Sequence, residues 1–211
     1  MANDLVSYTL IVQGLLEANT TRFPQATVTA ALRQAIDEYN RHVPWLESGT
    51  ITAVANQQDY SLSALTGLIM PYDVLDENGS PISFYSYRQD GVTPYIFIAP
   101  AQPAGDVITI RYTKLNTLKD LDSASTTTIR TDHTNLICAG AVGFALKIRL
   151  SVRLEADNLD PTTIESYRHL SEQYLVAYYA QLAGMRAEQG VQKEPGSDTR
   201  TWEDEYHNWP S

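Results

Sequence analysis

Histidine and cysteine are the side chains best suited to bind zinc or to act as catalytic bases and nucleophiles, and this chain has few of them. Zinc sites need such ligands at short spacings. Cys138 is the single cysteine, so it has no partner for a disulfide within the chain. The histidines stand far apart, at His42, His133, His169 and His207. We therefore expect no metal site, and we interpret the histidines as surface or helix-end residues.

Calcium-binding and hydrolase motifs are also incomplete. Asp120-Leu121-Asp122 resembles half of a calcium loop, but the glycine and the distal glutamate of an EF-hand are missing. The sequence contains no G-x-S-x-G nucleophile motif. Adjacent carboxylates such as Asp37 and Glu38 lie in polar stretches, where nothing would raise a pKa for acid–base work. The sequence thus predicts a protein with no catalytic centre and no cofactor.

The charge pattern argues against nucleic-acid binding and against a membrane span. The chain of 211 residues has 15 basic and 25 acidic side chains, a formal net charge of −10, and the basic ones form no cluster. Binding to the phosphates of a nucleic acid requires clustered lysine and arginine side chains. The longest apolar stretch, 136–150, is interrupted by Lys147 and Arg149 and is expected to be too short to cross a bilayer. An apolar content of 43% in a chain of this length predicts one composite globular domain.

Apolar residues at helical spacing predict four helices, with the ranges 4–19, 27–42, 133–152 and 161–189. Asp4 and Asp132 are expected to cap the first and the third, because their side chains can accept hydrogen bonds from free backbone amides. Pro161 suits the first turn of the fourth helix, where its missing amide would be unpaired anyway.

Between the second and third predicted helices the periodicity changes from helical to alternating. Residues 49–115 predict an antiparallel module of five or six short strands, with a hairpin at Asn78-Gly79. A polar linker, 115–130, returns the chain to the helices, and residues 191–211 predict an extended C-terminal arm. The predicted class is α+β: a helical bundle of two N-terminal and two C-terminal helices, with an inserted antiparallel β module and the arm. Residues 1–190 form the single composite domain.

Aromatic and small residues indicate surfaces that meet other proteins. Tyrosine outnumbers phenylalanine by 13 to 4, and tyrosine is enriched at protein interfaces; a half-exposed sheet face explains the excess equally well. In the arm, Trp202, Tyr206 and Trp209 stand at i, i+4 and i+7, on one face of a short helix. We expect them to anchor the arm on a partner; folding back onto the chain's own bundle is the alternative.

Four residues of the last two predicted helices are candidates for packing between subunits. The small residues Gly140 and Gly143 would let another helix approach closely. Tyr174 and Tyr178 lie on the apolar stripe of the fourth helix.

The order of elements and four local stretches resemble those of a known family. The stretches are 28–44, which closes a helix on Arg41-His42-Val43-Pro44, then 59–62, 95–103 and 108–112. They are similar to tailed-phage head-to-tail adaptor proteins, also called connector or neck proteins, over about residues 5–186. The resemblance implies a homo-oligomeric, dodecameric ring bound beneath the portal protein. A tail or nozzle protein would attach below it, and genomic DNA would pass through the lumen without specific binding.

The resemblance also implies a role and a location for the arm. Trp202, Tyr206 and Trp209 would reach up to the portal, and the protein would reside in the neck of the virion after synthesis in the host cytoplasm, with no membrane involved. A carbohydrate- or surface-binding module is the alternative class. In that case the β insertion would be the binding face, with Tyr85, Tyr87 and Tyr95 as a platform on which sugar rings stack.

Overall fold

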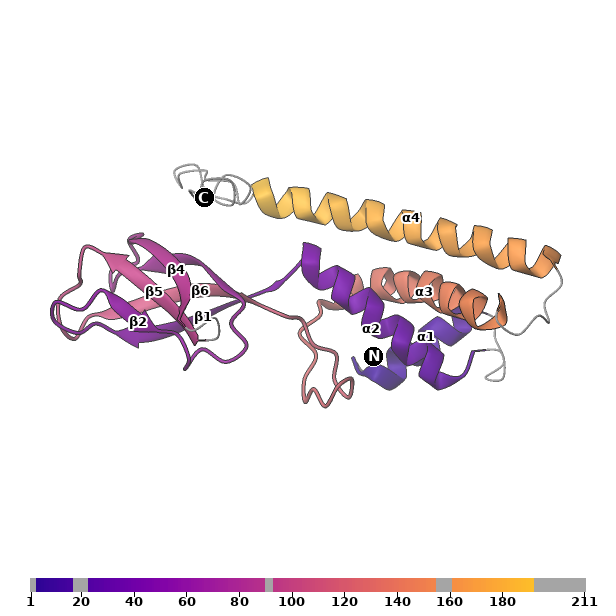
Figure 1. The fold of residues 1–211 in the computed structure, drawn as a ribbon, viewed down its shortest axis with the longest axis horizontal. Coiled ribbons are helices and arrows are strands. Elements are labelled where there is room, and N and C mark those ends of the chain that lie inside the picture. The colour runs from indigo at the N-terminus through magenta and orange to yellow at the C-terminus, as the bar shows by residue number, and fades with distance from the viewer. Residues whose placement is uncertain (1–2, 17–22, 90–92, 155–160, 192–211) are drawn as a thin grey trace.

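The computed structural model describes residues 3–16, 23–89, 93–154 and 161–191. Within them are four helices and two small antiparallel sheets of three strands each, so the predicted α+β class is confirmed. The strands lie between the second and third helices in the chain (Figure 1). The helices are α1 (Leu5–Leu15), α2 (Gln25–His42), α3 (Thr134–Leu154) and α4 (Pro161–Val191), and a 3-10 turn (Thr131–His133) directly precedes α3.

The helix starts follow the local sequence with one exception. Asp4 caps α1 as predicted: the hydroxyl and the backbone N–H of Ser7 donate to its carboxylate at 2.7 and 2.9 Å, and they lower its pKa. α4 begins at Pro161, as predicted. Asp132 was wrongly predicted as the cap of α3. It lies inside the 3-10 turn, where its carboxylate pairs with the Arg130 guanidinium at 2.7 Å.

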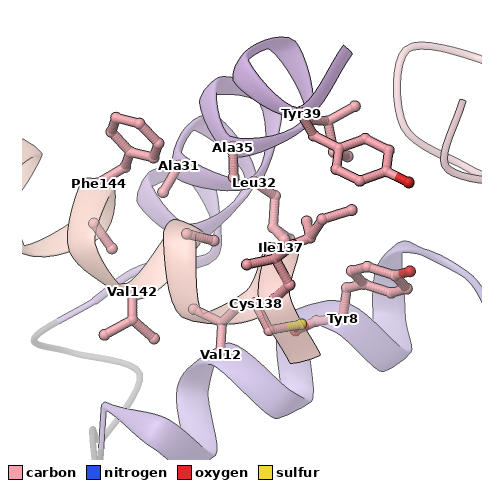
Figure 2. Close-up of a cluster of buried hydrophobic side chains, with 14 of the residues drawn as sticks. Tyr8, Val12, Ala31, Leu32, Ala35, Tyr39, Ile137, Cys138, Val142 and Phe144 are labelled. Atoms are coloured by element: carbon pink, nitrogen blue, oxygen red, sulfur yellow. The ribbon is translucent and has the colours of Figure 1, made fainter. Parts of the chain in front are cut away.

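α3 is the central helix of what we call the helical part, which comprises α1 to α4 and residues 115–133. It packs against α1, α2 and α4. Every residue from 136 to 146 except Ala139 is buried. Figure 2 shows Ile137 and Cys138 of α3 between Tyr8 and Val12 of α1 on one side and the apolar face of α2 on the other. A helix covered on several sides must be apolar around most of its circumference, which explains its composition.

The same composition corrects one expectation about membranes. By length and composition alone, Thr131–Val152 is long and apolar enough to cross a bilayer, whereas the sequence analysis predicted a stretch too short to do so. In the structure 56% of that helical window is buried within the fold. The packing of α3 against three other helices therefore accounts for its apolar character.

The β module, residues 45–114, consists of two antiparallel sheets around a core of its own. The first sheet has the order β1-β6-β3, formed by Trp45–Thr52, Val107–Lys114 and Met70–Leu75. The second has the order β2-β5-β4, formed by Asp59–Ser61, Thr93–Ala99 and Ser83–Gln89. The module begins earlier than the predicted start at 49, because β6 continues to Lys114 and gives Trp45 a partner in register. Its core contains side chains from both sheets, among them Ile96, Ile98, Ile108 and Ile110.

The predicted turn at Asn78-Gly79 forms, and it makes a short hairpin that connects the two sheets. The Asp76 carboxylate accepts hydrogen bonds from the backbone N–H groups of Asn78 and Ser80 at 2.9 and 2.7 Å, and Gly79 has a φ of +79°. Antiparallel pairing follows directly on both sides of the turn: the Ile82 N–H donates to the Val74 carbonyl at 2.8 Å, the Asp76 N–H donates to the Ser80 carbonyl at 2.9 Å, and Leu75 bridges Pro81. Beyond this point β3 pairs with β6, and β4 with β5. The predicted hairpin is therefore present but short, and its two strands continue in different sheets.

The segment 115–130 returns the chain from β6 to the helices, as predicted, but it is more than a polar linker. Leu118, Leu121 and Ile129 are buried in the core of the helical part. At the surface the Asp122 carboxylate pairs with Arg33 of α2, and this hydrogen-bonded guanidinium lowers the pKa of Asp122. Apolar residues spaced along a polar run thus fix the segment against the helices.

Two adjacent segments, 43–45 and 114–116, join the helical part to the β module, and we call them the neck (Figure 1). Asn116 ties them together. Its side-chain amide donates to Asn40 Oδ1 at 2.8 Å and to the Val43 carbonyl at 2.7 Å, and its backbone N–H donates to Asn40 Oδ1 at 2.7 Å. Both asparagines are buried, so this network satisfies polar groups that would otherwise lack partners. The two cores share no side chain.

Candidate functional site

The three aromatic residues predicted to anchor the C-terminal arm, Trp202, Tyr206 and Trp209, lie outside the described residues. α4 extends to Val191, where the predicted arm begins. The last turns of α4 lie beside the C-terminal end of α2, on the side of the helical part that faces the β module (Figure 1). α4 therefore ends at the neck end of the helical part.

The four residues proposed for subunit packing belong to the contact between α3 and α4 of one chain. A Cβ at Gly140 would lie 2.9 Å from the Tyr178 ring, and one at Gly143 would lie 2.7 Å from the Leu175 side chain. Tyr178 is 1% exposed and its hydroxyl donates to a backbone carbonyl of α2. Tyr174 is half-buried against the same core. Gly140, Gly143 and Tyr178 thus pack within a single chain, and a contact of the half-buried Tyr174 with another subunit stays a prediction.

Buried tyrosines account for much of the excess of tyrosine over phenylalanine. The Tyr8 hydroxyl lies 3.1 Å from Thr134 Oγ1, the Tyr60 hydroxyl donates to the Gln57 carbonyl at 3.0 Å, and the Tyr178 hydroxyl has the carbonyl partner described above. Phenylalanine would fill the same space but leave these partners without a hydrogen bond. Hydrogen bonds within the chain therefore explain why these buried positions carry tyrosine and not phenylalanine.

A groove of about 560 Å³ opens where the helical part meets the β module, and we call it the junction groove. Its walls come from the C-terminal halves of α2 and α4, the 3-10 turn with the residue before it, and the neck with the start of β1. Trp45 and Leu46 are 36% and 52% exposed there, so the groove offers apolar surface to solvent. Its other apolar lining residues are Val43, Pro44 and Met185.

The polar side of the junction groove is a chain of contacts from Tyr39 to Arg130. The Tyr39 hydroxyl lies 2.7 Å from His133 Nδ1, His133 Nε2 lies 3.8 Å from Asp132 Oδ2, and Arg130 donates to the same carboxylate at 2.7 Å. Burial raises the pKa of Tyr39 to about 12, so its phenol stays protonated at neutral pH. The hydrogen bond from Arg130 lowers the pKa of Asp132, so that carboxylate stays charged.

Tyr39 stays a protonated phenol at neutral pH, whereas His133 and Asp132 of the same lining are residue types that can transfer protons. The residues that line the junction groove include no serine, cysteine or lysine. Cys138 is buried elsewhere, and burial raises its pKa to about 12, which keeps it a thiol. Among the residues that the structure describes, no group of three or more His, Cys, Asp or Glu side chains is placed to hold a metal ion.

Two further apolar surfaces lie on different sides of the helical part. Val6 and Leu10, one turn apart on α1, are 59% and 64% exposed, and we call them the α1 face. Val176 and Tyr179, one turn apart on α4, are 70% and 40% exposed, and we call them the α4 face. α3 lies between α1 and α4 (Figure 1). Clustered exposed apolar residues mark candidate contact sites for other proteins.

The residues of the predicted sugar-stacking platform lie on neighbouring strands of the second sheet. Tyr85 pairs with Phe97 and Tyr87 pairs with Tyr95 in the backbone register of β4 and β5. Tyr85 is 57% exposed, and its ring stacks on that of Phe97 with a centroid separation of 4.8 Å. Tyr95 is half-buried, and the side chain of Tyr87 lies outside the described part of the chain. The structure thus brings the paired backbone positions together and describes one largely exposed ring among the three.

The junction groove is not visible in the sequence, because its residues come from distant stretches of the chain. Tyr39 and His133, for example, are 94 positions apart. His133 does lie at a helix end, as predicted, but its side chain is only 12% exposed. Gly184 lies in the interior of a predicted helix, where glycine is unfavourable, but a single glycine does not indicate a groove.

Comparison with known proteins found no family model and no curated protein that matches this chain. A function must therefore be argued from the surfaces described above and from the order of the elements.

Proposed function

We propose that this protein is a structural virion protein, a head-to-tail adaptor whose ring lies beneath the portal, joins the capsid to the tail and lets DNA pass. The observation that carries the proposal is the order of elements: two helices, a β module on a narrow neck, and two more helices. We interpret this order as a helical bundle with an inserted β module and a C-terminal arm, which is the layout of the adaptor proteins that the sequence resembles. A subunit with two separate cores and apolar outer faces suits a protein whose neighbours complete it.

The α1 face and the α4 face support a ring. Two different surfaces on one subunit favour a heterologous contact, in which the α1 face of one copy meets the α4 face of the next. Such contacts close into a ring when the rotation from one subunit to the next permits it. A dodecamer is the closure that the resemblance implies. Because Val6, Leu10 and Val176 are hydrocarbon side chains, their burial would stabilise the contact.

The charge of the chain supports the passage of DNA without specific binding. The net charge is −10, and binding phosphates requires clusters of unpaired basic side chains. Several of the basic side chains are paired with carboxylates inside the chain: Arg33 with Asp122, Arg111 with Asp73, and Lys114 with Glu47. A lumen built from such subunits would repel the duplex and let it slide.

Mixing two variants tests the ring. Leu10→Glu places a charge in the α1 face and Val176→Glu places one in the α4 face, and both positions are exposed, so both variants should fold. At a concentration where the native chain assembles, each variant alone should stay monomeric. An equimolar mixture should form a one-to-one dimer and nothing larger, because each dimer keeps one intact contact. Size-exclusion chromatography with multi-angle light scattering distinguishes these species, and a native chain that stays monomeric with and without portal protein contradicts the ring.

Removal of the arm tests the contact with the portal. A chain that lacks residues 192–211 should keep the fold, since the described core ends within α4. It should no longer co-sediment with portal protein, because Trp202, Tyr206 and Trp209 are absent. A variant that keeps the arm but carries Trp202→Ala and Trp209→Ala is the matched control for chain length and should behave like the deletion. Full co-sedimentation of the shortened chain would show that the arm is not the portal anchor.

One observation favours the alternative of a carbohydrate- or surface-binding module. Tyr85 is 57% exposed and stacks on Phe97, and sugar rings bind to exposed aromatic faces by stacking. A glycan array probed with the native chain and with Tyr85→Ala separates the two functions. The adaptor proposal expects no glycan signal from either protein, whereas a sugar site would give a signal that Tyr85→Ala removes.

A further inference from the structure

Gly184 in α4 has no packing reason within the described fold. Gly140 and Gly143 are required by the close approach of Tyr178 and Leu175, whereas a Cβ at Gly184 would meet no atom within 4 Å. Glycine is among the least favourable residues in a helix interior. A glycine that costs helix stability and that no neighbour requires leaves room for something outside the described fold, and Gly184 lines the junction groove.

The surroundings of Gly184 indicate what kind of molecule would fit. Trp45 and Leu46 present exposed apolar surface, Met185 adds a flexible thioether, and the volume of about 560 Å³ is in the range of sites that take several side chains. The polar side already pairs its groups with one another, since Arg130 bonds Asp132 and His133 bonds Tyr39. A ligand of this groove would therefore be held by apolar and aromatic contacts and not by charge.

The chain itself supplies such a ligand within reach. α4 passes the groove and ends at Val191, about 9 Å beyond Met185 at the rise of an α-helix. Residues 192–201 can span at most about 36 Å, which is enough for Trp202 to return to the groove. From there to Trp209 the arm carries three aromatic residues. A tether this short gives an effective concentration in the millimolar range, so the arm of the same chain has the advantage over the arm of a second copy.

We propose that in the free protein residues 202–209 dock in the junction groove of their own chain. Their aromatic rings pack against Trp45 and Met185, and their backbone approaches α4 at Gly184. The docked arm shields its tryptophans until a partner with greater affinity displaces it. This inference concerns the free chain, so it stands or fails independently of the ring and of the portal contact.

Filling the groove tests the proposal. Gly184→Met adds a long side chain at a residue that lines the groove and where a Cβ meets no atom within 4 Å, and Ala177→Met adds the same side chain at an exposed position of α4 that does not line the groove. Chymotrypsin should cut the native chain after Trp202 and Tyr206 at least tenfold more slowly than Gly184→Met. Ala177→Met should match the native chain. Equal cleavage rates in the native chain and in Gly184→Met would overturn the proposal.

A cross-link provides a second measurement that leaves Gly184 in place. A short bismaleimide should join Gln181→Cys to Asn208→Cys within one chain, because this pair leaves the three aromatic residues of the arm in place, while the buried Cys138 stays unreactive. The control pair is Glu165→Cys with Asn208→Cys, because position 165 lies about 24 Å along α4 from position 181, and its yield should be several-fold lower. Products at monomer mass support docking in the same chain. Products at dimer mass, or equal yields from the two pairs, overturn it.

Discussion

Tyrosine hydroxyls connect the elements of the helical part, whereas hydrocarbon fills most of the core of the β module. The bulkiest fully buried side chains of the helical part are Tyr8, Tyr39 and Tyr178, and each hydroxyl has a partner on another element. In the β module the fully buried side chains are aliphatic: Leu62, Val74, Ile96, Ile98, Ile108 and Ile110. The helical core thus combines bulky side chains with hydrogen bonds between elements, whereas the core of the β module is mainly aliphatic.

The difference follows from what each architecture fixes by itself. Hydrogen bonds between strands set the register of β1, β6 and β3, so the side chains of that sheet need only fill volume. A helix satisfies its backbone internally, so nothing in the backbone decides how α2, α3 and α4 lie on one another. Tyr178 fixes the packing of these helices in two ways. Its ring fills the space that Gly140 leaves, and its hydroxyl donates a hydrogen bond to the Ala35 carbonyl. Specific polar contacts are therefore needed in the helical part and can be spared in the sheets.

The largest expected effect comes from emptying one core at a time. Ile137 of α3 and Ile108 of β6 are both 0% exposed, and each lies in a different core. Ile137→Ala and Ile108→Ala should each cost about 2–5 kcal/mol of unfolding free energy, because each leaves a cavity. Each loss should stay in its own region, since the cores share no side chain. Hydrogen exchange measured by mass spectrometry on peptides from α3 and β6 reads the two regions separately.

The two isoleucine variants are controls for each other. If both of them lower protection in α3 and β6 equally, the regions unfold as one unit and the contrast between them is only one of composition.

A smaller effect should come from the glycines of the helical part. Gly140→Ala would press a methyl group against the Tyr178 ring and should cost about 1–3 kcal/mol. Gly184→Ala meets nothing within 4 Å and should instead stabilise the chain by up to about 1 kcal/mol, because alanine favours the helix. Urea midpoints give both values. If Gly140→Ala raised the free energy of unfolding, the Tyr178 ring would not fix the packing of the helices.

The sequence predicted the elements of both regions better than it predicted how they meet. Alternating and helical periodicities depend on which side of an element is buried, so the ranges of α2, α3 and α4 were close to those observed. The Asn78-Gly79 turn was also predictable, because Asp76 and a glycine with positive φ act locally. That β4 would leave β3 for β5 beyond this turn was not, since it depends on which strands pair in the folded module.

The candidate sites show the same difference between local patterns, which the sequence reveals, and contacts between distant residues, which it does not. The i, i+4, i+7 spacing of Trp202, Tyr206 and Trp209 is a local pattern and was visible in the sequence. The junction groove arises only when the neck brings Trp45 of β1 beside Met185 of α4, and no local pattern records that meeting. Gly140 illustrates the reverse error: a small residue on a helix indicates a close neighbour, but it does not say whether that neighbour belongs to the same chain.

The contacts of the neck should contribute less to the free energy of unfolding than the contacts of either core. Asn116→Ala removes the side-chain donor to the Val43 carbonyl and one of the two donors to Asn40 Oδ1, which keeps the backbone N–H of residue 116. It should cost about 1–3 kcal/mol, because buried acceptors lose hydrogen bonds. Small-angle scattering should also show a broader range of distances between the regions. Asn78→Ala, at an exposed turn, is the control and should stay within about 0.5 kcal/mol of the native chain. An unchanged scattering profile in Asn116→Ala would show that other contacts set the orientation of the β module.

The smallest effect is a pH dependence confined to the helical part. Burial raises the pKa of Cys138 from 9.0 to about 12, so the folded chain keeps the thiol proton where the unfolded chain loses it. The stability that this proton contributes is complete below pH 9, and it declines as the pH rises toward 12. At pH 10 the loss amounts to about 1.4 kcal/mol for a shift of this size. Cys138→Ala should remove that part of the decline, whatever its own cost at pH 7.

Urea midpoints of the native chain and of Cys138→Ala, measured with a reductant from pH 7 to 10, isolate the contribution of the thiol. The buried tyrosines of the helical part titrate in the unfolded chain from about pH 10 upward, so below that pH the difference between the two proteins belongs to Cys138. Hydrogen exchange should place the decline in α3 and leave β6 protected, because Cys138 lies in the helical core. Parallel curves for the two proteins would mean that the thiol ionises in the folded chain as readily as in the unfolded one. In that case the helical core admits water at α3, and its tyrosine hydroxyls would be hydrogen-bonded in a wet interior and not in a closed one.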